Sequence, residues 1–275
     1  MTAHITEKTM ALAREMSYAA GQKLRDYRGH VVGKSKGFRD FVSEADLASE
    51  SVILDAITTN YPEHGILSEE SGQNSHENSD YLWIIDPLDG TSNYLWGIPV
   101  SVVSVALAYR GQVRLGVVYD PWRDEMIWGW QGHGVYLNEQ EVHVTSHTKL
   151  AECLVGTDYG YRGERVNVSA VLSRSVQDKV AGLRAFSAGA LTLAYVACGR
   201  LDAYFNYGFN AWDMGAGAFL VAEAGGKSTN LRGGEEYLRT NSCLASNGLV
   251  HEEILSVWRQ DGIYERTSAF AAMPV

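Results

Sequence analysis

An apolar run at residues 81–85, Tyr-Leu-Trp-Ile-Ile, is followed at once by the segment Asp-Pro-Leu-Asp-Gly-Thr-Ser at residues 86–92. The run predicts a buried strand, and the proline and glycine after it predict a turn. Asp86 and Asp89 are three residues apart, so on a tight turn both carboxylates can face one point, which suits a hard cation such as Mg²⁺. The backbone N–H groups of the glycine and the two hydroxyl residues can hold an anion beside that cation. The segment therefore indicates phosphate chemistry.

Two further carboxylates lie in similar places, since Glu69 follows a short apolar segment and Asp213 precedes a small-residue run over 214–224. Four carboxylates converging in a poorly solvated cleft would repel one another, and two or three Mg²⁺ ions would neutralise them and leave positive charge for a phosphate dianion. Each alone also has a simpler explanation: Asp213 as a helix N-cap, Glu69 as a solvated loop residue, Asp86 with Asp89 as a turn. All lie at strand ends or a helix start, where α/β sheets gather their sites, and this favours a shared metal site.

Asp46 and Thr91 form a further candidate pair. A threonine hydroxyl near a carboxylate can orient and partly deprotonate a water molecule beside a metal ion, as general-base catalysis requires. Mg²⁺ would lower the pKa of that water and neutralise charge on the phosphoryl group. Asp46 alone is also explained as an acidic residue in the first turn of a helix, where it interacts with the helix dipole.

The first 80 residues predict two helices and two loops. Apolar residues at a near-helical period indicate a helix over 5–28, and a second runs from Glu44 to about Asn60, where a Tyr-Pro pair ends it. We expect the basic segment Lys34–Arg39 to be a mobile loop and the polar segment Gln73–Asp80 to be a surface loop.

From Ser101 the pattern changes to strands over 101–109, 113–119, 125–131 and 135–137, which predict an antiparallel meander with turns at Arg110-Gly111 and Gly132-His133-Gly134. After about Ala151 strands and helices alternate. The expected helices are Leu191–Ala197, Met214–Ala224 and His251–Gln260, and the expected strands are Ala203–Asn206 and Leu244–Asn247. The tail from Arg266 is predicted to be loosely ordered. The pattern predicts a layered α/β fold with two sheets and no separable linker.

Composition narrows the function. The balance of 23 basic and 33 acidic residues gives a net charge of −10, which argues against a nucleic-acid backbone or an anionic membrane as the main partner. Cys153, Cys198 and Cys243 are widely spaced, so neither a disulfide framework nor a zinc site is expected. No signal-peptide pattern begins the chain, and no apolar run reaches the ~18 residues that span a bilayer. We therefore expect a cytoplasmic protein.

Three separated motifs resemble the inositol monophosphatase family of Mg²⁺-dependent, lithium-sensitive phosphomonoesterases. They are Asp-Phe-Val-Ser-Glu-Ala-Asp at 40–46, the segment from Trp83 to Tyr94, and Trp-Asp-Met-Gly-Ala-Gly at 212–217. Between the first two, Ser-Glu-Glu-Ser at 68–71 is similar to the family's Gly-Glu-Glu-Ser. The resemblance covers roughly residues 8–260 and implies an α-β-α-β-α sandwich of the inositol monophosphatase and fructose-1,6-bisphosphatase type, usually dimeric.

The resemblance also implies one domain over residues 1–275, with a metal- and phosphate-binding half at about 1–150 and a substrate-side half at about 151–265. It implies a set of Mg²⁺ ligands: Glu69, Asp86, the carbonyl of Leu88, Asp89 and Asp213. Glu69 and Thr91, with Asp46 behind Thr91, would activate the attacking water. Gly90, Thr91 and Ser92 would hold the phosphate.

The substrate side departs from the family pattern. Many relatives read Gly-Ser/Thr-Ala-Ala where this chain has Ser187, Ala188, Gly189 and an alanine, and they often place a glutamate that grips sugar hydroxyls where this chain has Asn206. An amide can bond a hydroxyl but lacks the strength of a charged acceptor. Ser187, Ala188, Gly189 and Asn206 are the candidate substrate-binding residues.

We expect Mg²⁺-dependent hydrolysis of inositol monophosphate or a related sugar or polyol phosphate by a homodimer. Nucleotidases that act on 3′-phosphoadenosine phosphates typically have Lys-Glu-Phe where this chain has Ser92-Asn93-Tyr94, which favours the inositol or sugar phosphatase branch. The alternatives on this scaffold are a nucleotidase for 3′-phosphoadenosine phosphate or NADP, a histidinol-phosphate phosphatase and a fructose-1,6-bisphosphatase. A non-catalytic protein associated with RNA or the transcription machinery is the weaker alternative, because every residue of the implied catalytic set is present.

Overall fold

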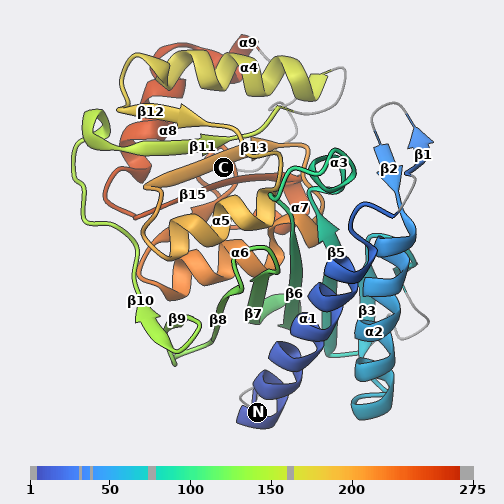
Figure 1. Ribbon diagram of the computed structural model, residues 1–275. Helices are drawn as coiled ribbons and strands as arrows, with labels where there is room; N and C mark the ends of the chain where they lie inside the picture. Colours follow the sequence, from blue (N-terminus) through green and yellow to red (C-terminus); the bar gives the residue numbers. More distant parts are fainter. Residues whose placement is uncertain (1–4, 31–32, 38–39, 74–78, 160–163, 267–275) are drawn as a thin grey trace.

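The computed structural model describes residues 5–30, 33–37, 40–73, 79–159 and 164–266. In these ranges the strands form an eight-stranded sheet, a five-stranded sheet and a two-stranded hairpin (Figure 1). The larger sheet contains β3 (Gly65–Ser68), β4 (Gly72–Gln73), β5 (Tyr81–Asp89), β6 (Val102–Tyr109), β7 (Gln112–Asp120), β8 (Glu125–Trp130), β9 (Val135–Leu137) and β10 (Gln140–Val142). The smaller contains β11 (Leu154–Thr157), β12 (Gly182–Arg184), β13 (Ala203–Tyr207), β14 (Lys227–Thr229) and β15 (Ser242–Ser246). The hairpin is β1 (Lys34–Gly37) with β2 (Asp40–Val42).

The larger sheet has the strand order β10-β9-β8-β7-β6-β5-β3-β4, and β3 runs parallel to β5 while the other neighbours are antiparallel. The smaller has the order β12-β11-β13-β15-β14, with β11 parallel to both of its neighbours. The helices are α1 (Glu7–Tyr27), α2 (Glu44–Asn60), α3 (Thr91–Leu95), α4 (Glu164–Gln177), α5 (Gly189–Ala197), α6 (Ala211–Glu223), α7 (Tyr237–Thr240), α8 (His251–Gln260) and α9 (Ile263–Arg266), with a short 3₁₀ turn at Leu150–Glu152.

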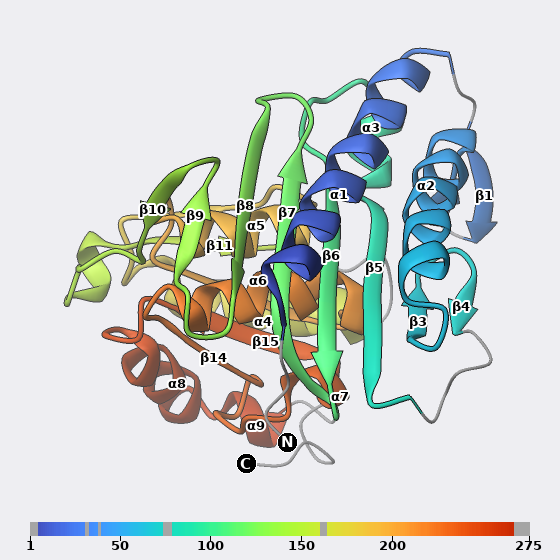
Figure 2. The same ribbon diagram turned by 90° about the horizontal axis from the view of Figure 1, so that it is seen from below.

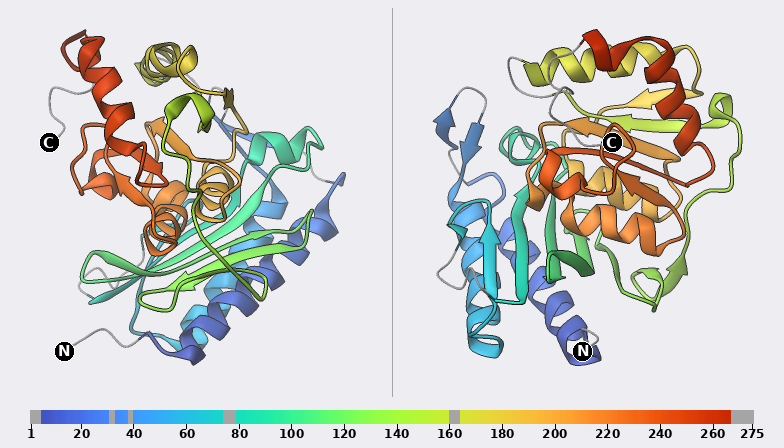
Figure 3. Two further views of the ribbon diagram at one scale, coloured as in Figure 1. Left: turned by 90° about the vertical axis from the view of Figure 1, so that its left-hand side faces the viewer. Right: turned by 180° about the vertical axis from the view of Figure 1, so that it is seen from behind.

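The elements stack in five layers. Figure 2 shows α1 and α2 on one face of the larger sheet. Helices α5 and α6 lie between the two sheets, and α4 and α8 cover the outer face of the smaller one (Figures 1 and 3). This is the predicted α-β-α-β-α sandwich. Among the described helices, none has both the length and the apolar content that crossing a bilayer requires.

Strand β5 shows why the layers form. Its side chains alternate between two apolar layers, because Trp83 and Ile85 pack among residues of α1 and α2 while Ile84 packs among those of α5 and α6. Both faces of the strand are therefore covered, as its continuous apolar sequence requires. Continued by one residue, the alternation places Asp86 on the side of α5 and α6.

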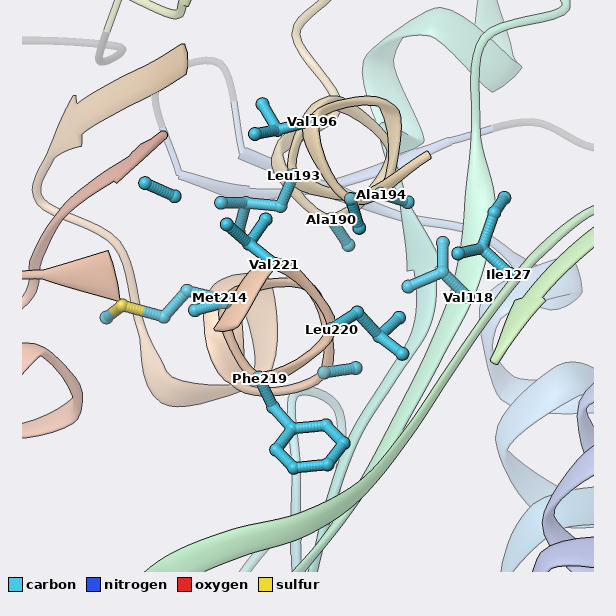
Figure 4. Packing of buried hydrophobic residues seen from close by; sticks show 14 of the residues in the cluster. Val118, Ile127, Ala190, Leu193, Ala194, Val196, Met214, Phe219, Leu220 and Val221 are labelled. Atoms are coloured by element: carbon cyan, nitrogen blue, oxygen red, sulfur yellow. The ribbon is translucent and has the colours of Figure 1, made fainter. Parts of the chain in front are cut away.

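The middle layer depends on small residues. A Cβ atom on Gly217 of α6 would lie only 2.4 Å from Cβ of Leu193 in α5, so the close approach of the two helices requires glycine there. Figure 4 shows Leu193 and Val221 between these helices, and Leu220 near Val118 and Ile127 of the larger sheet. Two thin helices thus fill the space between the sheets.

The sequence-based element predictions were largely confirmed. Helices α2 and α8 have the predicted bounds, and so has strand β9. The antiparallel meander over β6 to β9 is present, including the turns that join its strands. Helix α6 begins at Ala211, three residues earlier than Met214, because Asn210 rather than Asp213 is its N-cap.

Two predictions were wrong. Residues 34–37 of the expected basic loop form strand β1, because their backbone pairs with β2, while residues 38–39 lie outside the described residues. Gln73, at the start of the other expected loop, pairs with Leu67 as part of β4, and residues 74–78 of that loop are likewise outside the described residues. Residues 267–275 of the expected loose tail are also outside them.

Candidate functional site

The Asp-Pro-Leu-Asp segment is the last part of strand β5 rather than a turn after it. Asp86 pairs with Ser104 and Asp89 pairs with Val102. The chain therefore advances three residues on β5 for two on β6, and β5 bulges between the two aspartates. Proline lacks an N–H for the ladder, which makes this a natural place for a bulge. The bulge turns both Asp86 and Asp89 into the interior, where 1% and 7% of their surfaces remain exposed.

Glu69 is brought beside Asp86 by parallel pairing. Ser68, the last residue of β3, pairs with Ile85, and the N–H of Glu69 donates to the carbonyl of Ile85 over 3.2 Å. The carboxyl ends of two parallel strands meet at one sheet edge, which is where the sequence predicted a site.

Asp213 approaches from the middle layer. It is the third residue of α6, and its Oδ2 accepts from the backbone N–H of Asn210 over 2.6 Å in a capping box. Asp213 is therefore not the N-cap that its simpler explanation supposed, but it takes part in the capping of α6 and also lies near the other carboxylates.

The four carboxylates influence one another electrostatically. Burial, together with the negative charges of Glu69, Asp89 and Asp213, raises the pKa of Asp86 well above its usual value. Burial, with Asp213 and then Asp158 as the facing negative charges, raises the pKa of Asp89 to about 8. Backbone N–H donors act in the opposite direction on both groups. The structure thus collects like charges where water cannot easily solvate them, and a divalent cation would relieve that cost.

Asp89 is also the anchor for helix α5. Its Oδ1 accepts from the N–H of Gly189 over 3.1 Å, and its Oδ2 accepts from Ala190 over 2.8 Å and Leu191 over 3.3 Å. A carboxylate at a helix N-terminus is favourable because the first N–H groups have no partner within the helix. Asp89 therefore connects the end of β5 to the start of α5.

Helix α2 holds three parts of the site with one face. Asp46, Ser49 and Glu50 are buried at positions i, i+3 and i+4. Asp46 accepts from Thr91, and Ser49 donates to the carbonyl of Pro87 over 2.7 Å. Glu50 accepts from the hydroxyl of Ser68 and, over 3.0 Å each, from the N–H and hydroxyl of Ser71. The sequence analysis missed Ser49 and Glu50, although polar residues at helical spacing after Asp46 were a usable signal.

Thr91 and Gly90 form the turn after β5. The hydroxyl of Thr91 lies 3.3 Å from Oδ1 of Asp46 and 3.1 Å from the carbonyl oxygen of Leu88. Gly90 has a φ of 89°, and a Cβ there would lie 2.8 Å from the carbonyl oxygen of Val100. Both the backbone conformation and the close approach require glycine. Ser92 is the second residue of α3 and is partly exposed.

The predicted substrate-side residues lie beyond Asp89. Ser187 has a left-handed φ of 54°, Ala188 is the N-cap of α5, and Gly189 is the first residue of that helix. Asn206 is only 3% exposed, and its Nδ2 lies 3.3 Å from both the carbonyl oxygen of Asp158 and the hydroxyl of Tyr204. The structure therefore brings Ser187 to Gly189 next to Asp89, whereas the amide of Asn206 is engaged within the protein.

The donor set fits Mg²⁺ in chemistry, since carboxylate and carbonyl oxygens are the ligands that hard cations prefer. Oδ1 of Asp86 and Oδ1 of Asp89 each accept one N–H and so retain a second lone pair for a metal, whereas Oδ2 of Asp89 already accepts two. In the part of the chain that the structure describes, no three His, Cys, Asp or Glu side chains are as yet arranged to hold a metal ion. Glu69, Asp86, Asp89 and Asp213 repel one another electrostatically, and they are the carboxylates that could hold such a cation.

The same architecture is found in solved structures of other proteins. The crystal structure of extragenic suppressor protein suhB from Bartonella henselae matches this chain with a TM-score of 0.89 and 33% identity, covering 92% of this chain and 99% of that chain. An inositol monophosphatase from Anabaena matches it with a TM-score of 0.84 and 35% identity, covering 92% of this chain and 96% of that chain. The layered sandwich is therefore the fold class of the inositol monophosphatases and their relatives.

The chain belongs to the inositol monophosphatase family, whose model matches residues 5–262. Among its relatives, "Nus factor SuhB" from Pseudomonas aeruginosa is 40% identical over 226 residues, which are 80% of this chain and 83% of that protein. "Inositol-1-monophosphatase" from Mesorhizobium japonicum is 39% identical over 222 residues, again 80% of this chain and 83% of that protein.

Proposed function

We propose that this protein is a Mg²⁺-dependent phosphomonoesterase that acts on inositol monophosphate or a related sugar or polyol phosphate, as a homodimer. The observation that carries the proposal is that Glu69, Asp86, Asp89 and Asp213, from three separate segments, lie near enough for their charges to interact, with Asp86 and Asp89 buried. Buried like charges without a function would only destabilise the fold. Membership of a family of metal-dependent phosphatases supports the same conclusion.

In this proposal each residue of the site has a role. Glu69, Asp86, Asp89, Asp213 and the carbonyl of Leu88 would hold two or three Mg²⁺ ions. When bound, Mg²⁺ would lower the pKa of water and neutralise the charge that develops on the phosphoryl oxygens. Thr91 and Glu69 orient the attacking water, and Asp46 accepts the hydrogen bond of Thr91. The backbone N–H groups of Gly90, Thr91 and Ser92 bind the phosphate.

The substrate class is tested with purified protein, Mg²⁺ and a panel of phosphate esters. The panel contains inositol 1-phosphate, glycerol phosphates, fructose 1,6-bisphosphate, 3′-phosphoadenosine 5′-phosphate, NADP and histidinol phosphate. We expect the highest kcat/KM for an inositol or polyol phosphate. A higher value for one of the other esters would assign the corresponding alternative activity.

The metal site is tested with Asp86→Asn and Asp89→Asn. Losing one carboxylate ligand should lower kcat at least ~100-fold, because charge stabilisation by the metal is worth several kcal/mol. Asp55→Asn on the exposed face of α2 is the matched control and should leave kcat unchanged. Undiminished turnover in both site variants would remove the proposed function.

A second candidate function follows from the relative named Nus factor, because 40% identity allows a shared non-catalytic role. The Asp86→Asn variant separates the two candidates. If it replaced Nus factor SuhB in Pseudomonas aeruginosa as well as the unmodified chain does, an interaction role independent of hydrolysis would be supported. Failure of both chains to replace that protein would reject the second candidate.

A further inference from the structure

Asp158 is a buried carboxylate outside all the motifs of the site. It follows the last residue of β11 and is 5% exposed. Its Oδ1 accepts from the backbone N–H of Ser187 over 2.6 Å, and its Oδ2 accepts from the hydroxyl of Tyr204 over 2.7 Å. Hydrogen bonds to an ionised acceptor are short and strong, so both contacts constrain their donors.

The bond to Ser187 acts on the start of helix α5. Ser187 has a left-handed backbone, which is costly for a residue other than glycine and requires support from its surroundings. Two residues later the helix begins with Gly189, whose N–H donates to Asp89, as do the N–H groups of Ala190 and Leu191. The segment is therefore held on one side by Asp158 and on the other by Asp89.

Tyr204 provides a second connection to the same segment. Its ring lies 5.8 Å from that of Phe209, centre to centre. The ring of Phe209 occupies the space beside Gly189, where a Cβ would lie 2.3 Å from the ring. The hydroxyl of Tyr204 donates to Asp158, and it lies 3.3 Å from the amide nitrogen of Asn206. Asp158 thus fixes α5 both through Ser187 and through the aromatic pair.

We propose that Asp158 is a positioning residue, which fixes the first N–H groups of α5 and through them the orientation of the Asp89 carboxylate. Its effect on the helix is independent of catalysis, whereas its effect on metal binding rests on the proposed function. Asn206 then belongs to the same positioning network rather than to the wall that touches the substrate.

The charge of Asp158 is a separate influence on Asp89, so two variants are needed. Asp158→Ala removes the charge and both hydrogen-bond acceptors. Asp158→Asn removes the charge but keeps an oxygen that can accept from Ser187. If positioning is the role, the asparagine variant should restore what the alanine variant loses.

The first measurement is amide hydrogen exchange at Gly189, Ala190 and Leu191, which requires no activity. We expect about tenfold faster exchange in Asp158→Ala, because this variant loses a charge-assisted hydrogen bond that holds the segment. We expect little change in Asp158→Asn. Asp202→Ala is the matched control. Asp202 is equally buried and accepts from the N–H of Leu154, at the opposite end of β11, over 2.7 Å. It should leave these three amides unchanged.

The second measurement is Mg²⁺ binding by calorimetry. The Mg²⁺ concentration that gives half-maximal activity is measured for the same variants. Asp158→Ala should weaken Mg²⁺ binding about tenfold and raise that concentration, while the KM for the ester changes less. Asp158→Asn should bind Mg²⁺ nearly as the unmodified protein does, and equal weakening in both variants would assign the effect to charge and overturn positioning.

Unchanged exchange at the three amides in Asp158→Ala would also overturn the proposal. If that variant does not fold, Tyr204→Phe takes its place, because it removes one of the two hydrogen bonds to Asp158 and keeps the charge. Faster exchange at the same three amides would then support positioning, and unchanged exchange would overturn it. If the unmodified protein neither binds Mg²⁺ nor hydrolyses an ester, the proposed function fails, and the exchange result still decides whether Asp158 positions α5.

Discussion

The hydroxyl of Thr91 lies 3.3 Å from Oδ1 of Asp46, although the two residues are 45 positions apart in the chain. The other oxygen of Asp46 is already committed, because Oδ2 accepts from the N–H of Ser43 over 2.8 Å and from its hydroxyl over 2.6 Å. The capping box of α2 therefore fixes the carboxylate and leaves one oxygen facing Thr91. The same aspartate serves as the first-turn acid of a helix and as the acceptor for a candidate catalytic hydroxyl.

Removing the hydroxyl of Thr91 should lower the rate of the chemical step. We expect Thr91→Val to reduce kcat by about 10²- to 10⁴-fold, the range typical of a lost proton-transfer group, with a small change in KM. Thr91→Ser keeps the hydroxyl and should retain most of the activity. Steady-state kinetics at saturating Mg²⁺ make the comparison. A valine variant that turns over at the unmodified rate would exclude Thr91 from activating the water.

Glu50 should support the turn that carries Glu69. Glu50→Ala leaves the hydroxyl of Ser68 and the N–H of Ser71 without their acceptor, so we expect a loss of about 1–3 kcal/mol in the free energy of unfolding. We also expect a higher Mg²⁺ concentration for half-maximal activity, because Glu69 lies within this turn. Urea denaturation and Mg²⁺ titrations measure the two effects. The control is Asp55→Ala on the exposed side of the same helix. Equal effects in the two variants would contradict the role of Glu50.

Much of the fold could be predicted from local sequence. The bounds of α2 were correct because Ser43 is a capping residue and a Tyr-Pro pair follows the helix. The meander was correct because Arg110-Gly111 marks a tight turn between strands of clear β propensity. Strand β1 was missed because its pairing with β2 depends on a neighbouring backbone and not on side-chain preference.

The site was predictable only where its residues have chemistry of their own. Carboxylates at the ends of apolar runs could be recognised from the sequence as candidate metal ligands. The structure does bring Glu69, Asp86, Asp89 and Asp213 near one another. Asp158 also follows a strand, but the sequence analysis did not select it, because its role depends on contacts with Ser187 and Tyr204, which are 29 and 46 residues away. Such contacts are properties of the folded chain.

Mg²⁺ should stabilise the protein more as the pH rises. The pKa of Asp89 is raised in the folded state to about 8 from an ordinary value of 3.8, chiefly by burial. Its contribution to stability is therefore fully present below pH 3.8 and is lost as the pH rises through about 8. A bound cation should offset that loss by stabilising the ionised form. Urea denaturation across this range, with EDTA or with Mg²⁺, measures the difference. Asp89→Asn should reduce both the pH dependence and the effect of Mg²⁺. A Mg²⁺ effect of constant size at all pH values would contradict this account.

His251 should make the folded protein less stable in acid. The imidazole is buried between two hydroxyls, with Nε2 2.9 Å from Oγ1 of Thr229 and Nδ1 2.9 Å from Oγ of Ser246. Burial, and then the charge of Lys227, lowers the pKa of His251 from 6.5 to about 4.

Because the folded-state pKa of His251 is the lower one, the unfolded chain binds its proton first. The contribution of His251 is fully present above pH 6.5 and is lost as the pH falls through about 4. The full shift corresponds to a loss of roughly 3 kcal/mol in the free energy of unfolding. His251→Gln should be less stable at neutral pH but should lose less stability on acidification than the unmodified protein. His133→Gln, at an exposed position in the turn between β8 and β9, should leave the acid slope unchanged. Chemical denaturation at several pH values measures the slopes, and equal slopes for the unmodified protein and His251→Gln would show that another group causes the acid sensitivity.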